Sequence, residues 1–190
     1  YHAQTGALLW AHNDGGDIVS SPVAFNDAAS GFDLVCYGIG NPSYDVICRN
    51  ALTGALVWKF NTGNIVNISP TYSDGKIIVG NGRGNWYCLN AASGKLIWLY
   101  QAVGGNFYSA AVSGNIVAIP SAEFDRAIHF VDFTTGMLIK KVRVSATGLL
   151  KPGATSSQLE PDTSVAESPA LVPPEIYDLL VQMPKLQRDA

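Results

Sequence analysis

Short apolar segments alternate along the chain with turns rich in Gly, Asn, Asp and Ser. The clearest example runs from Ser69 to Tyr100. Its apolar stretches read SPTYS, KIIVGNG, WYCLN and KLIWLY, and the turns DG, RGN and AASG separate them. β-Branched and aromatic residues dominate these stretches, and Asp-Gly between two apolar runs is a strong hairpin signal. The pattern therefore predicts four short antiparallel strands.

One phrase of this pattern, Ser or Thr followed by Gly and later by Trp, recurs along the chain. The glycines in register are Gly6, Gly54, Gly94 and Gly136. The residue four positions after each of them is, in order, Trp10, Trp58, Trp98 and Lys140. A period of about 40 to 50 residues is typical of propeller blades and of helical arrays. Because the repeat body is β-rich, the sequence predicts an all-β fold, a β-propeller of four-stranded antiparallel blades.

The repeated phrase has an expected structural role. The Ser/Thr-Gly pair should lie in the turn between the third and fourth strands, where Gly adopts positive φ at little steric cost. The Trp should then leave the outer strand and pack against the neighbouring blade. Replacing Trp98 by Ala should therefore cost roughly 3 to 5 kcal/mol of stability. Lys140 replaces the Trp in the last copy, so that junction should be looser or differently filled.

The alignment divides the chain into blades. We expect a partial blade at 1–13, full blades at 14–61, 62–101 and 102–144, and an enlarged inter-blade loop at 145–167. Residues 168–190 should begin a further blade, because SPALVPPEIYDLL resembles SPVAFNDAASGFDLV. The alternative is a disordered linker followed by a docking peptide. Closed propellers have four to eight blades, so we expect an excised piece of a longer chain, or else edge strands that pair with another subunit.

Composition narrows the class of protein. The chain is 47% hydrophobic and 14% charged, which excludes the disordered class. A formal net charge of −3 gives no reason to expect a nucleic-acid partner. No apolar run reaches the roughly 18 residues of a membrane span.

The cysteines Cys36, Cys48 and Cys88 have no metal-binding spacing. Cys48 and Cys88 occupy equivalent positions in successive blades, which favours a shared packing role. With a hairpin centred near Pro42, Cys36 would face Cys48 across two antiparallel strands. Both a cross-strand disulfide and free thiols remain open, and the strain common in such pairs favours free thiols.

The phrases NALTGALVW and NAASGKLIW resemble the pyrroloquinoline-quinone-like repeat, the tryptophan-docking motif of quinoprotein dehydrogenases and BamB-like propellers. They match its Ala, Thr/Ser-Gly and Trp elements, with Asn50 and Asn90 where the family usually has Asp. The resemblance implies a propeller and an extracytoplasmic location, in the periplasm or at the cell surface. It leaves activity open, since the same blades serve alcohol and sugar dehydrogenases and non-catalytic proteins.

The catalytic parts of such dehydrogenases are not evident. No adjacent cysteines and no dense carboxylate cluster for calcium occur. We interpret NDGGD (13–17) as a connection into the next blade and GNGRGN (80–85) as a hairpin turn rather than a phosphate loop. The histidines form no catalytic arrangement. We therefore predict no catalytic residue, no metal site and no cofactor; pyrroloquinoline quinone and calcium belong to the dehydrogenase alternative.

The loops that enter each inner strand are the expected binding face, because loops on a rigid scaffold carry most binding roles. The alternative is that they are simply good turns. The candidate residues for binding a partner are Asp17, Asn64, Asn67, Asn106 and Tyr108.

Three functions compete. We favour a non-catalytic scaffold that binds protein partners through its loops. The alternatives are a fragment of a quinone-dependent alcohol or sugar dehydrogenase whose catalytic residues lie elsewhere, and a propeller module of a multidomain protein.

Overall fold

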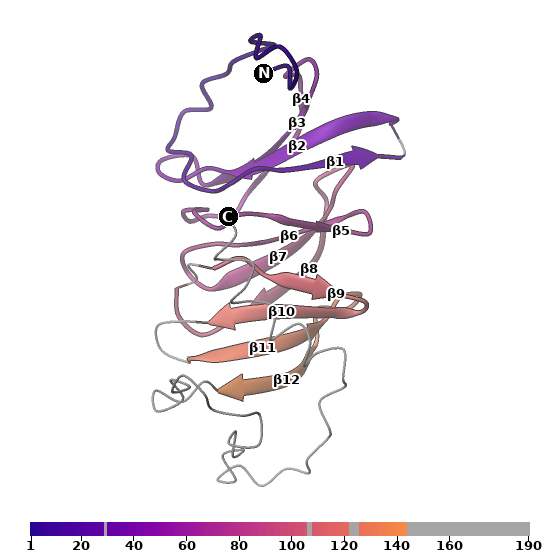
Figure 1. Ribbon diagram of the computed structural model, residues 1–190. Coiled ribbons are helices and arrows are strands. Elements are labelled where there is room, and N and C mark those ends of the chain that lie inside the picture. The colour runs from indigo at the N-terminus through magenta and orange to yellow at the C-terminus, as the bar shows by residue number, and fades with distance from the viewer. Residues whose placement is uncertain (29, 106–107, 122–125, 144–190) are drawn as a thin grey trace, which may run out of the picture. The chain divides into compact units, whose positions relative to one another are not determined.

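A computed structural model describes residues 1–28, 30–105, 108–121 and 126–143. The described part is all β and holds three four-stranded antiparallel sheets (Figure 1). The strands are β1 Val23–Asp27, β2 Phe32–Gly38, β3 Asp45–Asn50, β4 Leu56–Asn61, β5 Thr71–Ser73, β6 Lys76–Gly80, β7 Asn85–Asn90, β8 Leu96–Gln101, β9 Ala111–Ser113, β10 Ile116–Ser121, β11 Ala127–Asp132 and β12 Leu138–Arg143. The predicted all-β architecture of four-stranded blades is confirmed.

The chain divides into a compact unit at Tyr1–Thr147 and a second unit at Gly148–Ala190. The second unit lies wholly outside the described residues. The expected inter-blade loop at 145–167 and the expected further blade at 168–190 therefore also lie outside them.

Each sheet is a simple meander in which strands pair in chain order. The third and fourth strands shift register at the same place in every sheet, after Cys48, after Cys88 and at Phe130. This repetition shows that the three sheets are copies of one unit, and it makes their positions directly comparable.

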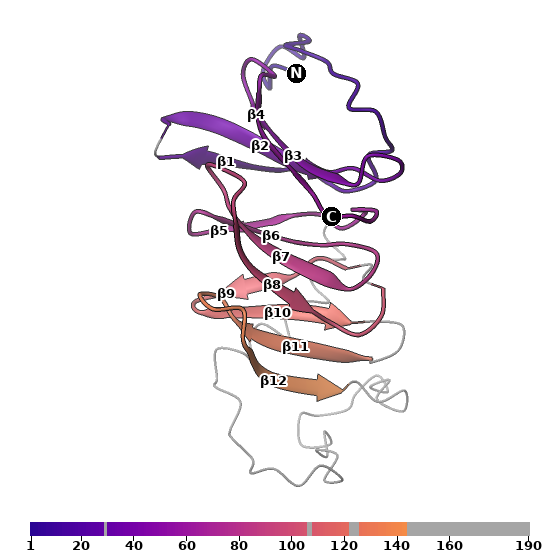
Figure 2. The same cartoon turned by 180° about the vertical axis from the view of Figure 1, so that it is seen from behind.

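Successive sheets follow one another in chain order (Figures 1 and 2), and apolar side chains of neighbouring sheets are buried together. One core cluster joins residues of the first sheet, such as Leu34 and Trp58, to Ile77 and Leu89 of the second. Another cluster joins the second sheet to the third. The layered core is what a blade requires, because a single sheet cannot bury both of its faces.

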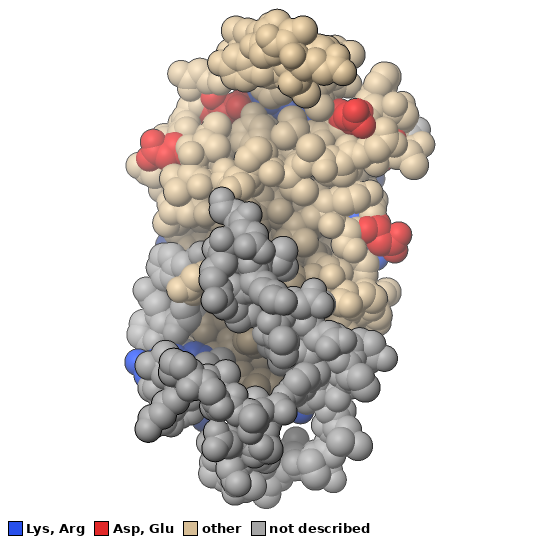
Figure 3. All heavy atoms as spheres, in the orientation of Figure 1, with Lys and Arg blue, Asp and Glu red and all other residues tan. Residues whose placement is uncertain are grey.

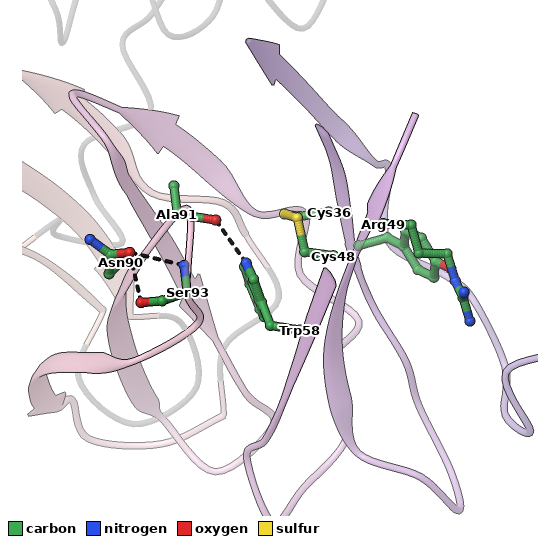
Figure 4. Close-up of a disulfide and its surroundings, with 8 residues drawn as sticks. Cys36, Cys48, Arg49, Trp58, Asn90, Ala91 and Ser93 are labelled. Atoms are coloured by element: carbon green, nitrogen blue, oxygen red, sulfur yellow. Dashed lines mark hydrogen bonds between the residues drawn. A yellow bond between two sulfur atoms is a disulfide. The ribbon is translucent and has the colours of Figure 1, made fainter. Parts of the chain in front are cut away.

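The recurrent Trp of one sheet lies on the recurrent Gly turn of the next. Trp58 Nε1 donates to the carbonyl oxygen of Ala91 at 2.7 Å, as the close-up in Figure 4 shows. The Cβ that an alanine would place on Gly94 falls 2.6 Å from the Trp58 ring. Trp98 repeats this arrangement with the carbonyl of Phe133 at 3.0 Å and with Gly136. Both tryptophans are buried.

The glycine turns share one backbone conformation. Gly54, Gly94 and Gly136 have φ of +73°, +68° and +74°, in the left-handed region that favours glycine. The side chain four residues before each glycine caps the turn. Asn90 Oδ1, for example, accepts from the backbone N–H of Ser93 at 2.9 Å (Figure 4).

Residues 1–13 carry the turn and the tryptophan of the repeat. The same turn forms here, since the N–H of Gly6 donates to His2 O at 2.8 Å and Gly6 has φ of +66°. Trp10 also makes the equivalent contacts, because its Nε1 donates to Ala51 O at 2.8 Å and its ring lies against Gly54. No described strand includes residues of this segment, because the first strand of the described part begins at Val23.

Lys140 lies on β12 in register with Phe130, and its side chain is exposed. In the other two sheets the corresponding position is occupied by Trp58 opposite Cys48 and by Trp98 opposite Cys88. What fills the junction after β12 stays a prediction.

Of the two alternatives for the cysteines, the structure has the disulfide. Cys36 and Cys48 face each other in register, with their Cα atoms 4.1 Å apart (Figure 4). The free thiols that strain would favour are therefore not present at this pair. Cys88 is free and fully buried, and this burial raises the pKa of its thiol to about 12.

Candidate binding face

The connections between successive sheets lie beside the loops that join the second and third strands of each sheet. The N–H of Val66 donates to Ile39 O at 3.2 Å, and the N–H of Gly82 donates to Ile65 O at 2.9 Å. Ala102 N–H donates in the same way to Gly84 O at 2.9 Å. These connections and loops (13–22, 39–44, 62–70, 81–84, 102–105 and 108–110) form what we call the loop face. The β1–β2 and β3–β4 turns lie at the opposite end of the strands.

Two predicted residues of this face come together at Gly40. The N–H of Gly40 donates to the backbone oxygen of Asp17 at 2.7 Å. A Cβ on Gly40 would meet Asn67 Oδ1 and the Asp17 oxygen, both at 3.4 Å. The side chains of Asp17 and Asn67 are exposed. The close approach that glycine allows at this position therefore brings the backbone of Asp17 and the side-chain amide of Asn67 to the same loop.

Of the other three predicted residues, the structure describes Asn64 and Tyr108. Asn64 is half-buried, and its Oδ1 lies 2.7 Å from the position of a Cβ on Gly82 in the next loop. Tyr108 lies in the connection between β8 and β9 and is 54% exposed. Asn106 lies outside the described residues.

Serines that were not among the predicted binding residues also line the loop face. Ser21 and Ser69 precede the innermost strands β1 and β5, and the N–H of Ser21 donates to Ser69 Oγ at 2.9 Å. Ser20 Oγ accepts from the N–H of Gly38 at 2.9 Å. A Ser-Pro pair repeated at 21–22 and 69–70 was the signal that could have identified them.

A buried polar cluster lies behind the first part of this face. Arg49 pairs with Asp14, and the Asp14 carboxylate also accepts from Tyr37 Oη at 2.6 Å. Arg49 Nε donates to the Tyr37 oxygen at 3.0 Å. One signal for this cluster was present in the repeat, because Arg49 is the counterpart of the fully buried Leu89 in the second sheet.

The cluster shifts the ionisation of its members. Burial by itself would raise the pKa of Asp14, but hydrogen bonds from Arg49 and Tyr37 outweigh it and hold that pKa below its ordinary value. Burial, followed by the hydrogen bond to Asp14, raises the pKa of Tyr37 to about 12. The arrangement is a satisfied ion pair that holds segment 13–17 against β2 and β3.

Carboxylate ligands for calcium are not clustered in the described residues. No three His, Cys, Asp or Glu side chains of the described part come together to hold a metal ion. Two carboxylates near the loop face are paired, since Asp14 binds Arg49 and Asp45 binds Lys59 at 3.2 Å. Figure 3 likewise shows acidic side chains only singly on the described surface of this view. We therefore derive no catalytic step through such a group.

The described part of the chain contains no helix that is long and apolar enough to cross a membrane.

Comparison with known proteins gives a family. The sequence profile of the family described as outer membrane protein assembly factor BamB matches residues 42–168. Among curated proteins, the chain is similar to tetrathionate hydrolase from Acidithiobacillus ferrooxidans, with 26% identity over 116 residues. That match covers 51% of this chain and 23% of the hydrolase.

Solved structures resemble the fold. BamB from Moraxella catarrhalis superimposes with a TM-score of 0.61 and 26% identity, over 75% of this chain and 42% of that protein. A europium-containing methanol dehydrogenase superimposes with a TM-score of 0.59 over 72% of this chain and 27% of that enzyme. Its 16% identity shows a shared fold alone. The chain thus spans less than half the length of each of these relatives.

Proposed function

Because the chain belongs to the family of the outer membrane protein assembly factor BamB, we propose that it is a non-catalytic β-propeller scaffold that binds protein partners through its loop face. The observation that carries the proposal is the position of Gly40, which lies against the Asp17 backbone and Asn67 Oδ1, because both of these residues are exposed on the loop face. Loops held by a rigid scaffold are the usual place for recognition.

The contacts below the face support a binding role rather than catalysis. The carboxylates Asp14 and Asp45 are committed to Arg49 and Lys59, so they serve to fix the loops. A fixed loop loses little conformational freedom when a partner binds, and this favours affinity.

We propose an extracytoplasmic location as well. The family is described by an assembly factor for outer membrane proteins, and this supports a site of action outside the cytoplasm. The Cys36–Cys48 disulfide supports the same location, because disulfides form and persist in oxidising compartments.

The test is site-specific photo-crosslinking in cells that produce the protein. A photo-reactive amino acid at Asn67 should trap a defined protein partner. The matched control is Lys95, which is exposed in the β7–β8 turn at the opposite end of the strands. Crosslinks at Asn67 and none at Lys95 support the loop face, whereas equal yields at both positions contradict it.

A second experiment addresses the dehydrogenase alternative. The full chain is incubated with pyrroloquinoline quinone and calcium, and dye reduction is followed with alcohol and sugar substrates. The scaffold proposal predicts no quinone binding and no dye reduction. Substrate-dependent reduction would overturn it.

A further inference from the structure

The outer strand of each described sheet leaves one edge open. The strand orders place β4, β8 and β12 at the edges of their sheets. An edge strand presents a row of backbone N–H and C=O groups to which another strand can pair. Natural proteins block such pairing with charged side chains, above all with lysine.

The three edges share exposed apolar side chains at equivalent positions. Leu56 and Val57 begin β4, Leu96 and Ile97 begin β8, and Leu138 and Ile139 begin β12, and all six are exposed. These shared apolar side chains favour strand pairing equally at all three edges. The other residues of each strand therefore decide which edge is protected against pairing with another strand.

The position opposite the middle of the third strand differs between the sheets. On β4, Lys59 lies opposite Ile47 of β3, and on β12, Lys141 lies opposite His129 of β11. The corresponding residue of β8 is Leu99, opposite Tyr87, and it is 53% exposed.

Charge is missing from the whole of β8. Its sequence is LIWLYQ, whereas β4 reads LVWKFN and β12 reads LIKKVR. Among the outer edges β4, β8 and β12 of the described sheets, β8 therefore lacks the lysine that the other two carry.

From this contrast we propose that the β8 edge pairs with the β8 edge of a second copy of this chain. An antiparallel pair of identical strands is related by a two-fold axis, so the same patch serves both subunits. Leu96, Ile97 and Leu99 then bury apolar surface against their counterparts while the open backbone groups form a ladder. The same arrangement of β12 would bring lysines near lysines, which is destabilising.

Charge also favours a second copy over a different partner. A β8 edge without charged residues offers nothing for a charged peptide to complement. This edge instead matches a strand that is neutral and apolar, and the β8 strand of a second copy is such a strand. This surface is distinct from the loop face, so the two proposals stand or fall separately.

The experiment measures the oligomeric state of the full chain by analytical ultracentrifugation across a series of protein concentrations. The wild-type chain should show a monomer–dimer equilibrium. Leu99→Lys should raise the Kd of the dimer by about tenfold or more, because a symmetric interface receives the charge twice. Lys is native at the equivalent position of both other sheets, so this variant should keep the fold, and circular dichroism checks that it does.

Two further variants sharpen the test. Leu99→Thr is the matched control, because threonine is neutral and suits a strand, and it should keep the dimer. Lys59→Leu removes the protecting lysine from β4 and should produce assemblies larger than a dimer. A wild-type chain that stays monomeric at every concentration would overturn the proposal. A dimer that Leu99→Lys leaves unchanged would overturn it too, since another surface would then hold the copies together.

Discussion

The indole ring of Trp58 lies directly against Gly94 of the following sheet, and a Cβ on that glycine would fall 2.6 Å from the ring. The indole N–H simultaneously donates to Ala91 O at 2.7 Å. A large ring and a residue without a side chain, 36 positions apart in the sequence, thus form one contact between neighbouring blades.

Replacing Gly94 by Ala should therefore destabilise the chain in two ways. The left-handed φ of +68° is unfavourable for alanine by roughly 1 kcal/mol, and displacing the Trp58 ring should add about 1 to 3 kcal/mol. Gly75→Ala is the matched control, since Gly75 has φ of +70° and nothing within 4 Å of its Cβ position. Urea unfolding measures both, and equal losses for the two variants would contradict the contact.

The hydrogen bond of the indole should be separable from its packing. Trp98→Phe keeps an aromatic ring but leaves Phe133 O without its donor, so it should cost about 1 to 3 kcal/mol. Trp98→Ala also removes the buried ring and should cost roughly 3 to 5 kcal/mol. Equilibrium unfolding gives both values. A Trp98→Ala variant as stable as the wild type would show that the ring does not hold the blades together.

Thiol counting should reveal the redox state of the cysteines. Without reductant, the folded chain should react with iodoacetamide at none of its cysteines, because Cys88 is buried with a pKa near 12 and the other two are joined. Denaturation should expose one thiol, and denaturation with reductant should expose three. Mass spectrometry counts the adducts. Three adducts without reductant would mean that Cys36 and Cys48 are free thiols.

The buried pair of Asp14 and Arg49 should make stability depend on acid pH. The pKa of Asp14 is lowered on folding, so its contribution is present above the ordinary value near 4 and is lost as the pH falls through the folded value. Asp14→Asn should cost about 3 kcal/mol at pH 6, because Arg49 then loses its buried partner.

The difference between Asp14→Asn and the wild type should shrink when unfolding is measured at pH 3 instead of pH 6. Asp74→Asn is the control, since Asp74 is exposed in the β5–β6 turn. A difference for Asp14→Asn that is the same at both pH values would exclude the ionised carboxylate as its cause.

Local patterns explain why much of the fold could be predicted. The strands of the second sheet, from Thr71 to Gln101, follow from apolar runs and from turn residues next to them in the chain. The register of Cys36 with Cys48 follows from a hairpin near Pro42. The oxidation state of that pair does not follow, because the residue pattern is the same for thiols and for a disulfide.

Contacts between distant parts of the chain could not be predicted in this way. Asp14 and Arg49 are 35 positions apart and meet only when segment 13–17 folds over the first sheet. Asp17 and Asn67 belong to loops of different blades, and both lie against Gly40 only because that residue has no side chain. Segment 1–13 forms its predicted turn without a described strand. A strand needs a neighbouring strand for its backbone hydrogen bonds, and the local hydropathy pattern does not show whether one is present.

The most direct test of the central claim is a double-mutant cycle between Trp58 and Gly94. Unfolding free energies are measured for the wild type, Trp58→Ala, Gly94→Ala and the double variant. If the ring and the glycine form the contact between blades, removing the ring relieves the clash of the new methyl group, and the double variant should be more stable than the two separate losses predict by about 1 kcal/mol or more. Losses that add within about 0.3 kcal/mol would show that the two residues do not interact and would contradict the account.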